Sequence, residues 1–171
     1  MTHTDDTTEA IEQRVRTAAD ATGVGYRVIP VDPELADTAN FCAHYGYPLE
    51  DSANCILVAS KKPQGCYAAC IVLATTKLDV NKTVRKHMGV RRLSFAGPEQ
   101  TREQTGMMIG GVTPFALPED LPVLVDARVM QRERIILGGG SRSSKIAAPP
   151  SILERLPNPL EVVEGLALPT S

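Results

Sequence analysis

The chain has 171 residues, of which 43% are hydrophobic and 22% are charged, and its formal net charge at pH 7 is −2. This mixture is typical of one globular domain, so we interpret residues 1–171 as a single domain with an N-terminal helical extension at about 1–24. The charge excludes a chain that binds polyanions over its whole surface, and 4% aromatic residues exclude a broad base-stacking face.

The first residues and the cysteines indicate the cellular compartment. The start MTHTDDTTEA is polar and acidic, unlike a secretory signal, and no run of about 18 apolar residues occurs. The four cysteines are Cys42, Cys55, Cys66 and Cys70, none with CxxC spacing. We therefore expect a cytoplasmic protein without a membrane span, with reduced, largely buried thiols and no metal site.

Apolar spacing and turn residues predict the elements of the first half of the chain. In order, these are a helix at 8–22 capped by Thr7 or Thr8, a strand at 26–31, a helix at 37–45, strands at 54–60 and 66–75 around Pro63-Gln64-Gly65, a basic helix at 80–88 and a strand at 92–95.

The second half continues this mixed pattern. It predicts a helix at 98–105, strands at 123–125, 134–137 and 145–147, a short helix at 150–156 and a strand at 162–163. Hairpins occur without regular βαβ alternation, which indicates largely antiparallel pairing. We therefore predict an α+β fold with a mixed, largely antiparallel, curved or barrel-like sheet flanked by helices.

The segment TGMMIGGVTP, residues 105–114, is the most informative stretch. Glycine allows a positive φ and lets the backbone approach a ligand, so such a loop can direct N–H groups at an oxygen or phosphate. We expect Gly111 to have a positive φ or a backbone face open toward the ligand. The alternative interpretation is a tight turn without a ligand.

Further motifs accompany this loop in a fixed order: YPLED at 47–51, NCILV at 54–58, NKTVRK at 81–86, FAGPE at 95–99, LPVLVD at 121–126 and GGGSRS at 138–143. With these motifs the chain resembles the YbaK / prolyl-tRNA-synthetase-associated editing domain family over roughly residues 25–165. The resemblance implies a mixed barrel flanked by helices.

The resemblance also implies an activity. A trans-acting aminoacyl-tRNA deacylase would hydrolyse mischarged tRNA, typically the proline tRNA carrying alanine or cysteine, without a cofactor. Its partners would be the aminoacyl-tRNA acceptor end and prolyl-tRNA synthetase, while the oligomeric state stays open. The implied catalytic residues are Gly110, Gly111, Val112, Thr113, Pro114 and Asn54. The implied substrate-binding residues are Gly106, Asp126, Gly138, Gly139 and Lys145.

Two positions leave alternatives open. Many family members carry a lysine where this chain has Asn54, and Lys145 could supply that cation or lie in solvent. Asp126 ends an apolar strand, where it could serve the site or cap the next turn. Because the family's lysine is missing, the alternative function is a silent tRNA-, nucleotide- or partner-binding module, and a hydrolase that uses Cys55 with His44 is a third option.

A basic cluster provides the local patch that a tRNA ligand needs. The stretch from Lys77 to Arg92 carries six lysines and arginines against Asp79 alone. We expect Arg85, Lys86 and Arg91 to contact tRNA phosphates, and the alternative is a solvated helix face.

Overall fold

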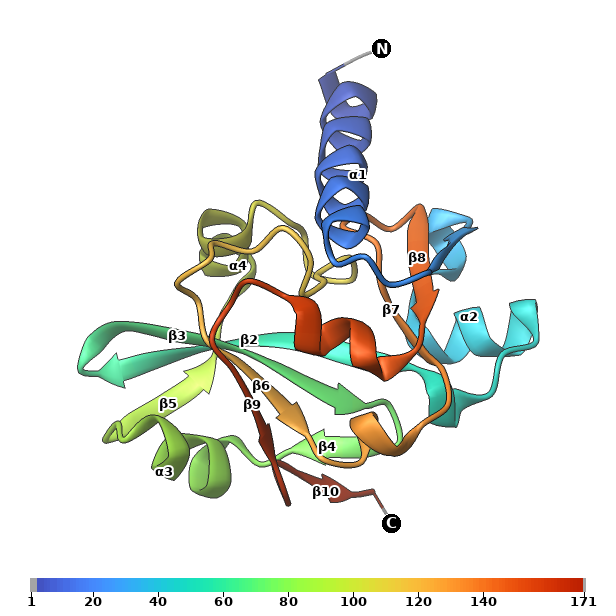
Figure 1. Cartoon of the computed structure of the whole chain (residues 1–171). Coiled ribbons are helices and arrows are strands. Elements are labelled where there is room, and N and C mark those ends of the chain that lie inside the picture. Colours follow the sequence, from blue (N-terminus) through green and yellow to red (C-terminus); the bar gives the residue numbers. More distant parts are fainter. Residues whose placement is uncertain (1–2, 171) are drawn as a thin grey trace.

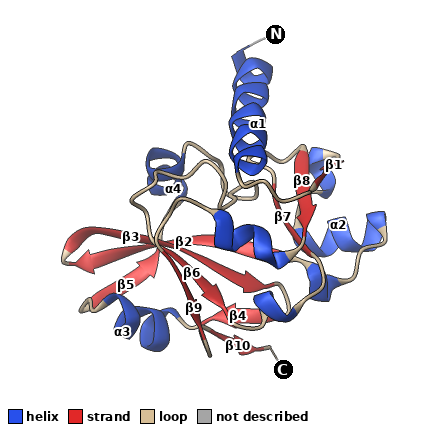
Figure 2. Ribbon diagram, in the orientation of Figure 1, coloured by secondary structure: helices blue, strands red, loops and turns tan. Residues whose placement is uncertain are grey.

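The computed structural model describes residues 3–170 as a mixed α+β arrangement (Figures 1 and 2). The helices are α1 (His3–Ala21), α2 (Thr38–Tyr45), α3 (Arg85–Met88) and α4 (Pro98–Thr105). The strands are β1 (Arg27–Pro30), β2 (Ala53–Lys62), β3 (Gln64–Leu73), β4 (Thr76–Leu78), β5 (Arg92–Phe95), β6 (Val123–Asp126), β7 (Ile135–Gly138), β8 (Ser144–Ala148), β9 (Leu160–Val163) and β10 (Ala167–Pro169).

The strands form three sheets that do not close into a barrel. A five-stranded sheet has the order β5-β2-β3-β6-β9, a three-stranded sheet has the order β1-β8-β7, and β10 pairs with β4. The pairs β2–β3, β2–β5, β1–β8 and β7–β8 are antiparallel, whereas β6 is parallel to β3 and β9. The predicted α+β class with a mixed, largely antiparallel sheet is confirmed.

Both faces of the five-stranded sheet are covered by apolar packing. Along β2, Leu57 and Ala59 belong to one buried cluster and Val58 to another, as the two-residue period of a strand requires. The first cluster also contains Val15 and Ala19 of α1, so this helix packs on the same core as β2 and β3. Figure 1 shows α1 standing beside β7 and β8 at the top of the molecule.

Three predicted helices differ from the structure, one in its start and two in their type. Helix α1 begins at His3, so neither Thr7 nor Thr8 is its N-cap. The expected basic helix starts as a π-helical turn at Val80–Val84, where the Asp79 carboxylate accepts the Thr83 N–H (3.4 Å) and hydroxyl (2.8 Å). The late helix is a 3₁₀ segment, Pro150–Arg155.

Strands β4 and β10 were not predicted. Each has three residues, and they pair only with each other across roughly ninety residues of sequence, so no local pattern marks them. Among the described residues, no helix combines the length and apolar character needed to cross a bilayer.

Candidate functional site

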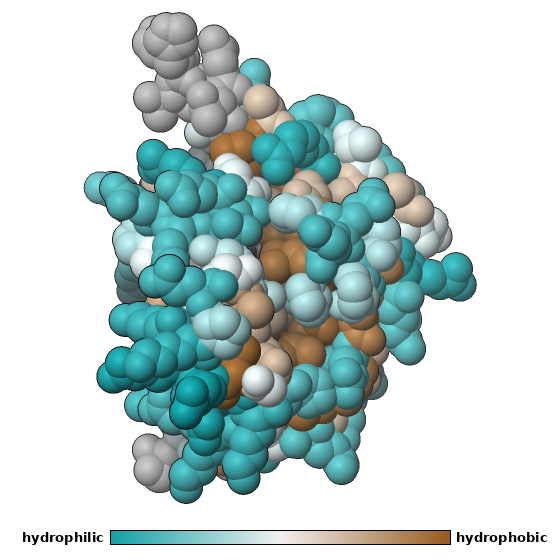
Figure 3. All heavy atoms as spheres, turned by 90° about the vertical axis from the view of Figure 1, so that its left-hand side faces the viewer, coloured by the Kyte–Doolittle hydropathy of each residue, from teal (hydrophilic) through white to brown (hydrophobic). Residues whose placement is uncertain are grey.

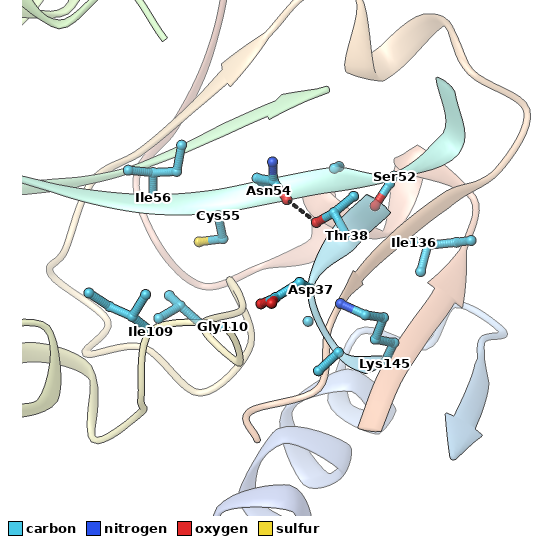
Figure 4. Close-up of a pocket in the computed structure, with 14 residues that line it drawn as sticks. Asp37, Thr38, Ser52, Asn54, Cys55, Ile56, Ile109, Gly110, Ile136 and Lys145 are labelled. Carbon is cyan, nitrogen blue, oxygen red and sulfur yellow. Dashed lines mark hydrogen bonds between the residues drawn. The ribbon is translucent and has the colours of Figure 1, made fainter. Parts of the chain in front are cut away.

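The glycine-rich loop and strand β2 enclose a cavity of about 210 Å³ (Figure 4). The N-terminal end of α2 and strands β7 and β8 complete its wall. The lining residues are Ala36, Asp37, Thr38, Ser52, Ala53, Asn54, Cys55, Ile56, Ile109, Gly110, Val112, Ile136, Gly138 and Lys145. Of the residues that the sequence assigned to catalysis or substrate binding, the cavity brings together Asn54, Gly110, Val112, Gly138 and Lys145.

The loop wall is a four-residue turn. The Gly111 N–H donates to the Met108 carbonyl (2.9 Å), and Gly110, at the third position of the turn, has a φ of 100°. A type II turn requires a positive φ at this position, which explains the glycine. A second constraint is Arg142, whose Nη1 atom would lie 2.7 Å from a Cβ at position 110. The Arg142 side chain could move aside, so the positive φ is the constraint that favours glycine here.

Gly111 has a different role from the one expected. Its φ is not positive, and a Cβ there would lie 2.7 Å from the backbone N and Cα of Ser141. Its bare face is therefore covered by the protein's own backbone and does not face the ligand. The expectation of a positive φ or an open face at Gly111 was wrong, because the position is fixed by close packing.

The second glycine segment interlocks with the first. A Cβ at Gly138 would lie 2.5 Å from the Val112 carbonyl oxygen, and the Gly140 N–H donates to the Gly111 carbonyl (2.8 Å). Gly138 lines the cavity, but Gly139 does not, and a Cβ on Gly139 would lie 2.6 Å from the Ser144 carbonyl oxygen. The two segments thus form one backbone-on-backbone wall.

Lys145 provides the cavity's buried cation. It extends from β8 into the cavity with its Nζ atom toward Asp37 (Figure 4), it is only 7% exposed, and its Nζ lies 5.2 Å from the centre of the Phe41 ring. Burial lowers its pKa, and the nearby Arg142 lowers it further, whereas the Cys42 thiol and Asp37 act in the opposite direction. Among the carboxylates whose side chains the structure describes, in residues 8–170, none forms an ion pair with Lys145.

Asn54 stands on the opposite wall, and α2 orients it. The Thr38 hydroxyl donates to the Asn54 Oδ1 atom (3.2 Å), which leaves the amide NH₂ group as a donor (Figure 4). The alternating pattern of β2 directs Asn54 and Cys55 to opposite faces of the strand. Both residues line the cavity, but in Figure 4 the Asn54 amide nitrogen points away from Gly110 and Lys145, so Asn54 contributes at the edge of the cavity beside Thr38.

Sequence reasoning missed Asp37 and Arg142 at the cavity mouth. Asp37 precedes α2 and makes no capping hydrogen bond with its side chain; instead it pairs with the Arg142 Nη1 atom (3.2 Å). Arg142 also donates from Nε to the Pro33 carbonyl (3.1 Å). The signal in the sequence was the arginine of the GGGSRS motif, which lies three residues before Lys145.

Besides Gly111 and Gly139, four assigned residues do not line the cavity. Gly106 ends α4 in the left-handed conformation, with a φ of 74°. Asp126 is 1% exposed, and its two oxygens accept the Arg128 and Ala167 N–H groups (both 2.8 Å), which matches the capping alternative. Thr113 and Pro114 are buried behind the loop, and within residues 3–170 the Thr113 hydroxyl has no hydrogen-bond partner.

The cysteines do not provide a nucleophile. Burial, and then the neighbouring Cys70, raise the pKa of the Cys55 thiol, so it stays protonated at neutral pH. All four cysteines are free, but Cys66 is exposed, against the expectation of largely buried thiols. Among the described residues, no group of three or more His, Cys, Asp or Glu side chains is arranged to hold a metal ion.

The basic residues lie outside the cavity, on α3 and the segment after it. Lys86 and Arg91 are exposed, and half-buried Arg85 donates from Nε to the Asn81 carbonyl (2.8 Å). They provide an exposed basic surface, whereas the cavity carries the polar groups that could bind a small substrate.

Solved structures share this fold. One is the crystal structure of a candidate trans-editing enzyme for prolyl-tRNA synthetase, with a TM-score of 0.76 and 20% identity over 94% of this chain and 97% of that one. Another is a protein designated APE2540, with a TM-score of 0.77 and 22% identity over 88% of this chain and 98% of that one. Identities this low show the fold alone, which is that of the editing-domain class.

Sequence comparison establishes the family. Residues 32–156 match the profile of the aminoacyl-tRNA editing domain, and the chain belongs to that family. It is also 35% identical over 95 residues to the uncharacterized protein YwhH of Bacillus subtilis (strain 168). That match spans 55% of this chain and 59% of YwhH.

Proposed function

We propose that the protein is a trans-acting aminoacyl-tRNA deacylase that hydrolyses mischarged tRNA, with the proline tRNA carrying alanine or cysteine as its substrate. One observation carries this proposal: a single cavity of about 210 Å³ is lined by Gly110, Asn54 and the buried cation Lys145. Prolyl-tRNA synthetase is the proposed partner, and the cytoplasm the proposed location.

The polar groups suit an ester joined to a nucleic acid. The Lys145 ammonium group would bind phosphate charge, because a cation in a partly desolvated cavity makes strong charge-assisted hydrogen bonds. The Gly110 N–H would donate to the carbonyl oxygen as negative charge develops on it, and the Asn54 amide would join it after its side chain rotates. Because the Cys55 thiol is protonated, the nucleophile is a water molecule that the substrate's ribose hydroxyl helps to organise.

Cavity size would select the amino acid. Hydrolysis adds one water molecule to the ester and releases a free amino acid and a tRNA with a free 3′-terminal ribose. A small cavity excludes larger side chains, but each methylene contributes only about 1–3 kcal/mol to discrimination. We therefore expect alanine and cysteine to be distinguished from larger residues more sharply than from each other.

A panel of mischarged tRNAs tests the proposal. We expect the protein to accelerate the loss of alanine or cysteine from the proline tRNA, measured as the decay of labelled ester. A matched reaction with correctly charged prolyl-tRNA is the control and should decay at the spontaneous rate. Spontaneous decay of every substrate in the panel would contradict the deacylase proposal.

The second candidate is a binding module that retains the fold without turnover. The uncharged Asn54 favours it, since many members of the family carry a lysine at this position. If the native protein binds tRNA without hydrolysis and Asn54→Lys creates hydrolysis, the binding module is the correct function.

A further inference from the structure

A second, apolar groove continues from the candidate site past the loop. Its volume is about 270 Å³, and Ile109, Gly110 and Val112 form a wall that it shares with the cavity. The groove adds Leu57, Phe95 and the N-terminal part of α4 on the far side. A ligand bound in the cavity can therefore extend into the groove across Ile109.

Phe95 is the unusual residue of this groove. The chain has three phenylalanines and no tryptophan; Phe41 and Phe115 are fully buried, whereas Phe95 is 53% exposed. Ile109, which lines the same groove, is also 53% exposed. Figure 3, which views the side of the molecule with β5, α3 and α4, shows apolar surface in a hollow among polar side chains. Phe95 is the one aromatic side chain that lines the groove, and an exposed aromatic ring can stack against a planar ligand such as a base.

Strand β5 connects this ring to positive charge. It starts at Arg92, which pairs with Lys62, and the Arg91 N–H donates to the Lys62 carbonyl (2.9 Å). From Arg92 to Phe95 the strand spans roughly 10 Å. Among the side chains of residues 8–170, none forms an ion pair with Lys62, Arg91 or Arg92, so these three cations can contact phosphates.

We propose that this groove binds the base of the penultimate nucleotide of an RNA 3′ end, stacked on Phe95, and that the RNA backbone follows β5 toward Lys62, Arg91 and Arg92. The proposal rests on the proposed function, which puts the terminal nucleotide in the cavity. Neighbouring bases would then lie on the two sides of Ile109. A docked protein segment is disfavoured, because strands β2 and β5, which line the groove, also carry the exposed cations Lys62 and Arg92.

The test is a double-mutant cycle between the ring and the base. The probe is an uncharged RNA stem–loop with a single-stranded 3′ end, either intact or without the penultimate base, and the readout is the dissociation constant at fixed salt. Phe95→Ala should weaken binding of the intact RNA roughly tenfold and leave binding of the abasic RNA nearly unchanged. Phe95→Tyr should restore binding of the intact RNA.

Leu168→Ala is the matched control, because Leu168 is also 53% exposed but lies on β10, and it should not change either constant. An equal loss for both RNAs, or no loss, overturns the proposal. The proposal is also overturned if Phe95 couples only to the terminal base. It is overturned again if Phe95→Ala loses binding to prolyl-tRNA synthetase while its RNA binding is intact. The RNA probe carries no ester, so this test is independent of deacylation. If Phe95 couples to the penultimate base but the protein does not deacylate tRNA, only the proposed function is rejected. If the protein deacylates tRNA but Phe95 does not couple to the base, only the groove proposal is rejected.

Discussion

The two walls of the cavity are built on different principles. In the glycine wall, Gly111 and Gly138 pack against backbone atoms, whereas Gly110 faces the Arg142 side chain, and the missing side chains give the wall its shape. The charged wall, formed by Asn54 and Lys145, depends on side chains, and one of them is an ammonium group whose burial lowers its pKa. We therefore expect the glycine wall to contribute to stability and the charged wall to cost stability.

The largest effect should come from adding one methyl group to the glycine wall. In Gly138→Ala the new Cβ would lie 2.5 Å from the Val112 carbonyl oxygen, so the backbone must move. We expect a loss of at least about 2 kcal/mol in the free energy of unfolding, or roughly 4–8 °C in the melting temperature, together with loss of activity. Thermal unfolding followed by circular dichroism measures this.

Gly25→Ala is the control for the glycine wall, since its φ is not positive and its Cβ would meet nothing within 4 Å. It should leave the melting temperature unchanged or slightly higher. If Gly138→Ala had the same melting temperature as Gly25→Ala, the close packing of the two glycine segments would not matter for stability.

The charged wall should respond in the opposite way. Lys145→Met should lower kcat/KM at least about tenfold, which corresponds to about 1.4 kcal/mol of transition-state stabilisation. The wild-type kcat/KM should fall as the pH rises through the lowered pKa of Lys145, because only the ammonium form binds phosphate. A pH profile of the variant that keeps this alkaline fall would contradict the assignment.

The same variant separates function from stability. Because the folded-state pKa of Lys145 is lowered, the unfolded chain binds more protons between that pKa and the ordinary lysine value, and wild-type stability should rise with pH over this interval. Lys145→Met should abolish that rise and should be as stable as the wild type or more stable at pH 7. Chemical denaturation at several pH values measures both effects.

The smallest effect should come from the exposed cations outside both walls. Replacing Arg85, Lys86 and Arg91 by alanine should weaken tRNA binding several-fold, with little change in stability. In a plot of the logarithm of the tRNA association constant against the logarithm of the salt concentration, the slope should flatten by about one unit for each phosphate contact that the variant has lost. An unchanged slope would assign the three residues to a solvated face.

Local patterns predicted the elements better than the site. Fixed-φ prolines and capping glycines marked α4 and the end of α3 correctly, because these signals act within a few residues. The role of Gly111 could not be predicted, since its packing partner Ser141 lies thirty residues further along the chain. The motif order indicated the family, but the Asp37–Arg142 pair needs the fold that brings α2 beside the turn before β8.

The packing of Gly111 against Ser141 also bears on how the cavity meets its ligand. The Gly140 N–H holds the Gly111 carbonyl, so the loop has no hinge of its own and must move together with the β7–β8 hairpin. A preorganised wall loses little conformational entropy when a ligand binds. We expect such a wall to move little around any ligand, so that discrimination by it would act as a fixed sieve and not as induced fit.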